Sequence, residues 1–192
     1  MSAGQWMMSA EGVRWFFDAG SLALDFGYTG DFGYGVAAWE RLHNPGDLDG
    51  WLGEHGGVAS GGRLPATERD FAEALQLRAA IWELARAAAD GVGADPLSID
   101  VVNRFARGLS PAPQLPGGAE SAPASTAAML LAAVARDAVT VFSSPDRIRR
   151  CGAEDCALIF HDGSRTQARR WCSMQRCGNR QKVRMHRARA SE

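Results

Sequence analysis

The chain has 192 residues, of which 46% are hydrophobic, and its formal net charge is −1. This length and apolar content suit a packed core in one domain, or in one domain plus a small module, and they exclude a disordered chain. The longest apolar stretch, residues 122–142, contains Arg136 and Asp137, which argues against a membrane-spanning helix. Residues 1–14 lack a basic region followed by an apolar core, so we expect no secretory signal and a cytoplasmic protein.

The first hydrophobic segment covers residues 15–26 and alternates at Leu22, Leu24 and Phe26. A short hairpin and the start of a helix both fit this segment, because periodicity over so few residues cannot distinguish them. The glycine-rich residues 27–35 lack the Gly-Lys-Ser/Thr ending of a phosphate-binding loop. We therefore interpret them as a flexible connection.

Residues 47–145 have the caps and the apolar periodicity of helices. Thr67 and Asp70 have the spacing of a capping box, and an apolar stripe continues from there to Asp90 or Gly91, which predicts a long helix. Three further helices are expected. They would run from a cap at Asp47 to Gly56, from a cap at Ser98 to Gly108, and from a cap at Thr126 to Ser143. The proline-rich residues 110–123 predict a loop. The sequence thus predicts a mainly α N-terminal domain over residues 1–146, with at most a short N-terminal hairpin.

The four cysteines of the chain form two pairs with matched spacing in its last quarter. The pairs are Cys151 with Cys156 and Cys172 with Cys177. Two such turns can direct four thiolates at one tetrahedral Zn²⁺ ion, with metal–sulfur distances of about 2.3 Å. Two disulfides are the alternative, but a reducing compartment favours the metal. His161 and His186 are alternative ligands, although four cysteines already complete the tetrahedron. We predict one structural zinc ion.

The residues around the cysteines predict a small module of the treble-clef or zinc-ribbon type. Residues 157–161 are β-prone and a turn signal follows at Asp162-Gly163, so we expect a hairpin between the two cysteine turns that returns through residues 169–171. Ser173 is expected to cap a terminal helix that continues to about residue 189.

Charge is distributed unevenly along the chain. Residues 1–146 carry 9 basic and 18 acidic side chains, whereas residues 147–192 carry 12 basic and 4 acidic ones. With one Zn²⁺ ion bound by four thiolates, the C-terminal module keeps a charge of about +6. Such an asymmetry indicates a polyanion as partner, and arginine suits phosphates and guanine edges. A genome rich in G and C also raises the arginine content, but it does not explain the clustering.

Placed on a helix at 100° per residue, four arginines of the terminal segment fall within an arc of about 80°. No acidic residue precedes Glu192 in this helix, so the arginines repel one another unless an anion binds between them. A solvated charged face is the simpler alternative. The candidate DNA-binding residues are Arg169, Arg170, Arg176, Asn179, Arg180, Lys182, Arg184 and Arg187.

Several motifs of this module resemble the CGNR-type zinc finger. They are Arg149-Arg150-Cys151, Phe160-x-Asp162-x-Ser164, Arg170-Trp171-Cys172-Ser173-Met174 and Cys177-Gly178-Asn179-Arg180. Residues 22–26 read Leu-Ala-Leu-Asp-Phe and resemble the signature of the ABATE domain, which precedes this finger in the family. The resemblance implies a bacterial stress-induced transcription regulator, with an ABATE-like domain at residues 1–146 and a CGNR-type zinc finger with four cysteine ligands at residues 147–192.

The resemblance also suggests a polar cluster in the N-terminal domain. Tyr28-Thr29 stands where the family pattern leads us to expect an asparagine–threonine pair, whereas Leu77-Arg78 fits the pattern. Asp25, Thr29 and Arg78 are our hypothesis for a ligand pocket. The structural alternative is an internal Asp–Arg pair that holds the N-terminal segment onto the long helix.

Two classes of function follow from these features. In the first, the finger binds DNA while the N-terminal domain senses a small-molecule effector or forms a homodimer. In the second, a zinc-containing scaffold protein docks its basic finger on an acidic partner or on its own acidic N-terminal domain. We expect neither a membrane partner nor an enzyme, because four thiolates leave the metal no open position and no nucleophile–base pattern is visible.

Overall fold

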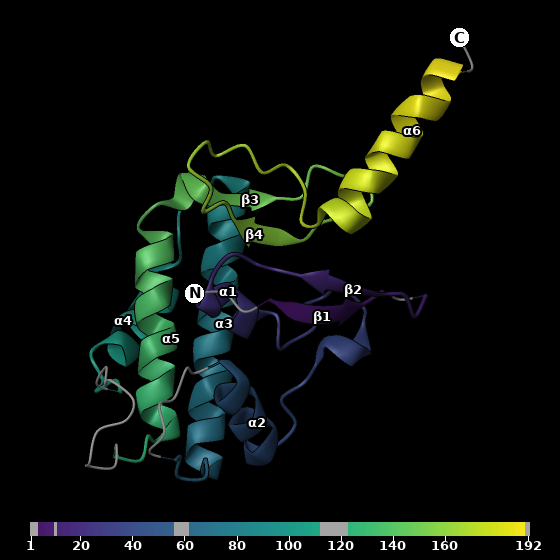
Figure 1. Cartoon of the computed structure of the whole chain (residues 1–192). Coiled ribbons are helices and arrows are strands. Elements are labelled where there is room, and N and C mark those ends of the chain that lie inside the picture. Colours follow the sequence, from purple (N-terminus) through teal and green to yellow (C-terminus); the bar gives the residue numbers. More distant parts are fainter. Residues whose placement is uncertain (1–3, 10, 56–61, 112–122, 191–192) are drawn as a thin grey trace, which may run out of the picture.

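The computed structural model describes residues 4–9, 11–55, 62–111 and 123–190, which form helices and two small antiparallel hairpins (Figure 1). The helices are α1 (Leu22–Gly27), α2 (Pro45–His55), α3 (Glu68–Asp90), α4 (Pro96–Ala106), α5 (Ala127–Phe142) and α6 (Asn179–Ala190). The strands are β1 (Gln5–Met8), β2 (Arg14–Phe17), β3 (Ile148–Arg150) and β4 (Ile159–His161). Short helical turns are η1 (Ala37–Trp39), η2 (Pro145–Arg147) and the π-type turn η3 (Met174–Gly178). The mainly α prediction is confirmed.

The capping box predicted for the long helix α3 is present. Asp70 donates its backbone N–H to the Thr67 hydroxyl at 3.2 Å, and Thr67 donates its N–H to the Asp70 carboxylate at 2.9 Å. The helix ends at Gly91, whose φ of 66° is in the left-handed region that favours glycine. Local sequence therefore determines both ends of this helix.

Two predicted caps are shifted by a few residues. Helix α4 is capped by Asp95, which accepts the backbone N–H of Ser98 at 2.9 Å, and not by Ser98 itself. In α2 the side chain of Asn44 accepts the N–H of Asp47 at 3.1 Å, so Asp47 lies in the first turn. Proline occupies the first helical position in both cases, and its fixed φ places the cap immediately before it. The predicted cap Thr126 of α5 is confirmed.

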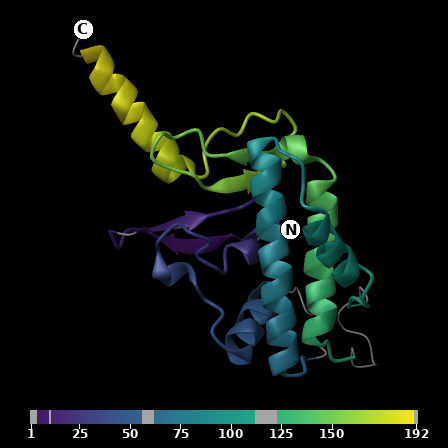
Figure 2. The ribbon, with the colours of Figure 1, turned by 180° about the vertical axis from the view of Figure 1, so that it is seen from behind.

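The helices build the first of two apolar cores. Helices α3 and α5 lie side by side, α4 packs against both, and α1 and α2 also contact α3 (Figures 1 and 2). Asp137 of α5 accepts the N–H of Ala23 at 2.8 Å and so holds the first turn of α1. The largest fully buried side chains of this core are Phe26, Leu48, Leu52, Leu77, Ile81, Leu130 and Leu131.

The second core joins the N-terminal hairpin to the C-terminal module. Strands β1 and β2 pair in antiparallel register, and their alternate side chains Met7, Trp15 and Phe17 are buried. These side chains form one cluster with Leu158, Ile159 and Phe160 and with three of the cysteines. Residues that are more than 100 positions apart in the sequence therefore share this core.

The first hydrophobic segment contains both structures that its sequence allowed. Residues 14–17 form strand β2, which pairs with residues 5–8, and residues 22–27 form helix α1. Two expectations fall on residues outside the described ranges, namely the end of α2 at Gly56 and most of the loop at residues 110–123.

The second hairpin differs from the prediction in its partner strand. Strand β4 pairs with β3, which precedes Cys151, and not with residues 169–171. Cys151 extends the ladder by donating its N–H to Leu158 at 2.8 Å, so the hairpin encloses the first cysteine pair. The Asp162 carboxylate accepts the Arg169 N–H at 2.9 Å and holds the returning segment without a strand.

Candidate metal centre

The four cysteine sulfurs form a compact cluster. All Sγ atoms lie within 4.8 Å of one another, with 3.7 Å between Cys156 and Cys172 and 3.5 Å between Cys172 and Cys177. A tetrahedron with metal–sulfur distances of about 2.3 Å has sulfur–sulfur distances of about 3.8 Å. The donor set therefore fits one zinc ion, as the sequence predicted.

Two short turns and the second core hold these sulfurs. Cys156 donates its N–H to Ala153 at 3.1 Å in the first turn, and Cys177 lies in η3, just before α6. Gly152 donates its N–H to Arg170 at 2.9 Å and so ties the two turns together. Ser173 precedes η3 but makes no side-chain cap, in contrast to the prediction. The metal site is thus fixed by backbone contacts between segments.

The electrostatics of the cluster favour a cation. Hydrogen bonds from Cys156 and Cys172 lower the pKa of Cys151, whereas the hydrogen bond to Cys151 raises the pKa of Cys156. Thiols this close share protons, because several adjacent thiolates repel one another. A divalent cation replaces these protons and allows all four sulfurs to ionise.

The two alternative ligands predicted from the sequence, His161 and His186, are not part of the four-cysteine cluster. His161 donates its backbone N–H to Ala19 at 2.8 Å, and its ring Nδ1 lies 3.3 Å from the carbonyl oxygen of Gly20. Glycine is required at position 20, because its φ is 86° and a Cβ there would collide with the carbonyl oxygen of His161. His186 is exposed on α6. Within the described part of the chain, the cluster able to hold a metal consists of the four cysteines.

Two of the predicted DNA-binding arginines are engaged inside the molecule. Arg169 places its guanidinium 4.1 Å from the ring centre of Phe160 and donates to the carbonyl oxygens of Asp18 and Cys172, both at 2.7 Å. Desolvation lowers the pKa of Arg169. Arg176 lies 3.7 Å from the ring centre of Trp15 in β2. Both side chains connect the finger to the N-terminal hairpin.

Two more of these arginines pair with acids of the first cysteine turn. Arg180 contacts Asp155 at 2.9 Å, and Arg184 contacts Asp155 at 3.1 Å and Glu154 at 3.9 Å. The terminal helix was expected to lack compensating acids, since it contains none of its own. The helix itself does lack acids, but the prediction that its arginines are uncompensated is wrong for Arg180 and Arg184, because the first cysteine turn supplies Asp155 and Glu154.

The remaining candidates face solvent. Arg170, Lys182 and Arg187 are exposed, and α6 extends away from the rest of the molecule (Figures 1 and 2). Asn179 is exposed and donates its side-chain amide to the carbonyl of Gln175 at 3.4 Å. Arg170 also lines an open groove of about 580 Å³ together with Arg149, which was not among the candidates.

The junction between the two parts uses residues that the sequence did not single out for this role. The Tyr28 hydroxyl accepts the N–H of Ile159 at 2.7 Å and donates to the carbonyl of the same residue at 3.0 Å. Tyr34 donates to the carbonyl of Ala157 at 3.1 Å. Arg150 pairs with Asp90 at the end of α3. Burial raises the pKa of Tyr28 well above its usual value, so the hydroxyl stays protonated.

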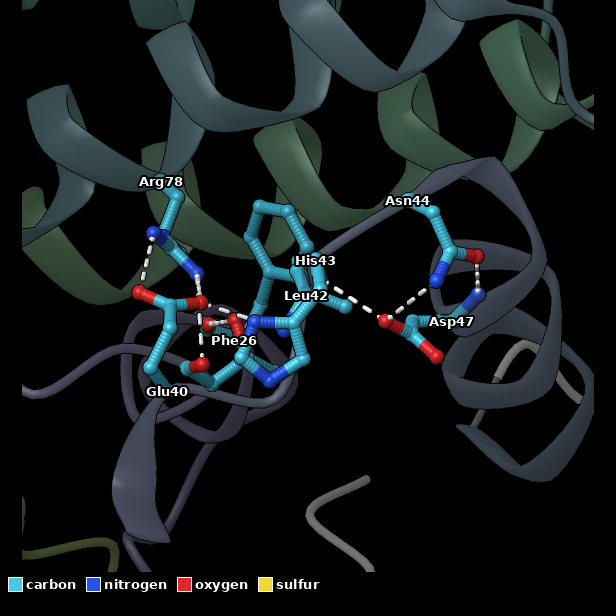
Figure 3. Close-up of polar contacts among 8 residues, drawn as sticks. Phe26, Glu40, Leu42, His43, Asn44, Asp47 and Arg78 are labelled. Atoms are coloured by element: carbon cyan, nitrogen blue, oxygen red, sulfur yellow. Dashed lines mark hydrogen bonds and ion pairs between the residues drawn. The ribbon is translucent and has the colours of Figure 1, made fainter. Parts of the chain in front are cut away.

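The predicted polar cluster is only partly assembled. Arg78 donates to both carboxylate oxygens of Glu40, at 2.8 and 2.9 Å, and to the carbonyl of Thr29 at 3.2 Å (Figure 3). Buried Asp25 instead accepts the N–H of Gly4 at 3.2 Å and that of Ala19 at 3.4 Å. Arg78 therefore holds the loop before α2 through Glu40, a partner that no motif in the sequence indicated.

A separate groove of about 600 Å³ lies beside β1. Its walls include the aromatic side chains of Trp6, Phe16 and Trp39 and the polar side chains of Arg41 and His55. Spacing along the sequence does not reveal this groove, because its walls come from β1, β2, η1 and α2.

Among the described residues, no helix combines the length and the apolar character needed to cross a membrane.

The fold and the site together define a zinc-finger protein with four cysteine ligands and a helical N-terminal domain. The family model for ABATE, described as a putative stress-induced transcription regulator, matches residues 20–145. The model for the CGNR zinc finger matches residues 147–190. The chain therefore belongs to the ABATE family and carries a C-terminal CGNR zinc finger. A search of curated proteins found no match.

Proposed function

We propose that this protein is a cytoplasmic transcription regulator whose zinc-stabilised C-terminal module binds the DNA backbone. The observation that carries the proposal is the charge of this module, in which residues 147–192 contain 12 basic and 4 acidic side chains. The family description of the N-terminal domain supports it. Phosphate contacts provide the part of DNA affinity that is independent of sequence.

The exposed basic residues are the best candidates for these contacts. In the described part of the chain, Arg149, Arg170 and Lys182 are exposed and form no ion pair with a carboxylate. Arg180 and Arg184 would first have to leave Asp155, and Arg169 and Arg176 would have to leave the aromatic rings that they cover. The DNA-facing surface is thus the groove that Arg149 and Arg170 line, together with the solvent-exposed side of α6.

The N-terminal domain would supply the sensing function. The groove beside β1 offers aromatic walls for stacking and the polar groups of Arg41 and His55 for orientation, a combination found in small-molecule sites. An effector bound there would contact β1 and β2, and the groove residues Met7, Tyr28 and Trp39 belong to the core that the finger shares. Occupancy of the groove is in this way connected to the position of the DNA-binding module.

A salt titration tests the DNA-binding proposal. Fluorescence anisotropy with labelled duplex DNA would be measured for the zinc-loaded chain at several salt concentrations. The wild-type slope of log K against log[salt] is expected to be about −0.9 for each neutralised phosphate, and R170Q and K182Q should each reduce it by roughly one contact. R69Q, in the exposed first turn of α3, is the matched control and should leave the slope unchanged. Absence of binding at low salt would refute the proposal.

The second candidate is a protein-interaction module. Arg180 and Arg184 already bind the carboxylates of Asp155 and Glu154, so the same basic face accepts acidic side chains. An acidic partner could use these contacts, and Val183 and Met185 add exposed apolar surface on α6. A non-catalytic role fits both candidates, because four thiolates leave a bound zinc ion no open position. Binding to an acidic peptide but not to DNA would select the second candidate.

A further inference from the structure

We propose that Arg180 is a positioning residue of the metal centre, where its guanidinium holds the Cys177 thiolate and clasps the two cysteine turns together. The proposal goes beyond DNA binding and assigns Arg180 a role for which the charge pattern of the helix gave no indication. It concerns zinc affinity, which can be measured without DNA.

The contacts of Arg180 reach both halves of the site. Its Nη2 atom lies 3.2 Å from Sγ of Cys177 in the second turn, and its Nη1 atom lies 2.9 Å from Oδ2 of Asp155 in the first turn. Cys177 is fully buried, whereas Arg180 is half-buried. The planar guanidinium presents both donors at a fixed angle, so a single side chain can fix the separation of the two turns.

The position of Arg180 follows from the local backbone. Cys177 lies in η3 and α6 begins at Asn179, so residue 180 returns over the Cys177 sulfur, as residues three positions apart do on a helix. Arg184 lies one turn further along and contacts Asp155 but no sulfur. Arg184 therefore holds the carboxylate that Arg180 uses, whereas Arg180 alone of the two reaches the metal ligand.

The contact between Arg180 and Cys177 increases zinc affinity through electrostatics. Four thiolates and one Zn²⁺ ion carry a net charge of about −2, and a guanidinium that donates to one sulfur offsets part of this charge. A charge-assisted hydrogen bond also orients the ligand before the metal binds. Loss of a partner of this kind costs metal sites about 10–100-fold in affinity.

The test compares zinc affinity among full-length variants by competition with a chromophoric chelator, in the absence of DNA. R180Q removes the positive charge and the planar guanidinium with its paired N–H donors, and we expect zinc affinity to fall about 10–100-fold. R187Q is the matched control, since Arg187 lies on the same face about 10 Å further along α6, and its affinity should stay within twofold of wild type. D155N should give a smaller loss than R180Q, because it removes one arm of the clasp and leaves the sulfur contact.

Cobalt substitution supplies a readout that a purely structural role would not change. We expect the sulfur-to-Co²⁺ charge-transfer bands to shift in R180Q and to stay in place in R184Q, because Arg180 donates to a cysteine sulfur whereas Arg184 donates to the carboxylate of Asp155. If R180Q fails to fold, R180K retains the charge without the planar guanidinium, and a shifted band with weakened zinc binding in R180K supports the proposal. Zinc affinity within twofold of wild type together with an unchanged cobalt spectrum, in R180Q or in R180K, would overturn it. Failure of DNA binding would not affect this outcome.

Discussion

Helices α3, α4 and α5 bury their apolar faces against one another. The module that follows them places Leu158, Ile159 and Phe160 in a core that it shares with the N-terminal hairpin and with Trp82 and Ala85 of α3. The helical region has a core of its own. The finger has a metal site and half of a shared core, because so short a segment has too little apolar surface to offset its chain entropy. A boundary near residue 146 therefore does not separate two cores, because the second core contains residues from both sides of it.

This difference predicts that metal removal damages the molecule unevenly. Chelation, or C177S, should abolish protection from amide exchange in β3 and β4 and also in β1 and β2, while α3 and α5 stay protected. Structural zinc contributes on the order of 10–16 kcal/mol in finger peptides, so this is the largest expected effect. Re-addition of zinc to the chelated wild type is the control. Protection that persists at residues 5–17 after chelation would show that the shared core does not couple the two hairpins.

Tyr28 tests the junction directly. Y28F removes both hydrogen bonds to Ile159 and leaves a buried N–H and a buried carbonyl without a partner, which should cost about 1–3 kcal/mol in the free energy of unfolding. Urea unfolding of the zinc-loaded protein measures this loss. Y34F is the matched control with a smaller expected effect, because its hydrogen bond to Ala157 is exposed to solvent. Equal losses in the two variants would contradict a special role for the buried contact.

The pair of Arg78 and Glu40 provides a comparison inside the N-terminal region. Burial is the largest single effect and raises the pKa of Glu40. The hydrogen bonds and the charge of Arg78, together with the hydrogen bond from the Leu42 N–H, outweigh it and lower the pKa of Glu40 below its usual value. A lowered folded-state pKa means that the pair contributes its full stability above pH about 4.3 and loses this contribution as the pH falls through the folded-state value. R78M should therefore cost about 1–2 kcal/mol at pH 7, after allowance for partial exposure, and less at pH 3.

The measurement for this pair is the difference in urea midpoint between R78M and wild type at the two pH values. R86M, at an exposed ion pair of the same helix, is the control and should differ little from wild type. A difference for R78M that is independent of pH would show that packing of the arginine stem, and not the ion pair, supplies the stability.

The smallest effect on stability is expected for the exposed ion pair at the edge of the junction between the finger and α3. Arg150 and Asp90 form an ion pair at 2.6 Å, but the two side chains are 36% and 45% exposed, so solvent screens the attraction. A double-mutant cycle with R150Q and D90N should give a coupling energy of about 0.2–1 kcal/mol that decreases with added salt. A coupling well above this range would show that the exposed rim holds the finger as strongly as the buried core.

The features that the sequence predicted well are those whose partners lie close along the chain. Thr67 and Asp70 are three residues apart, and each satisfies the other's backbone, so the start of α3 could be predicted without knowledge of its neighbours. The paired cysteines needed only two turns of matched length and a common metal. Where two cap-forming residues competed, as at Asp95 and Ser98, the prediction was wrong by one turn because proline decided the choice.

The helical class, the long helix and the four metal ligands could be predicted from the sequence, because local hydrogen bonds and ligand chemistry specify them. The pairing of β3 with β4, the contact between Tyr28 and Ile159 and the partners of the arginines emerge only in the folded chain. The reason is distance along the chain. An arginine on a helix looks the same in the sequence whether it faces water, an acid 25 residues earlier or a cysteine sulfur, and only the folded chain brings these groups to contact.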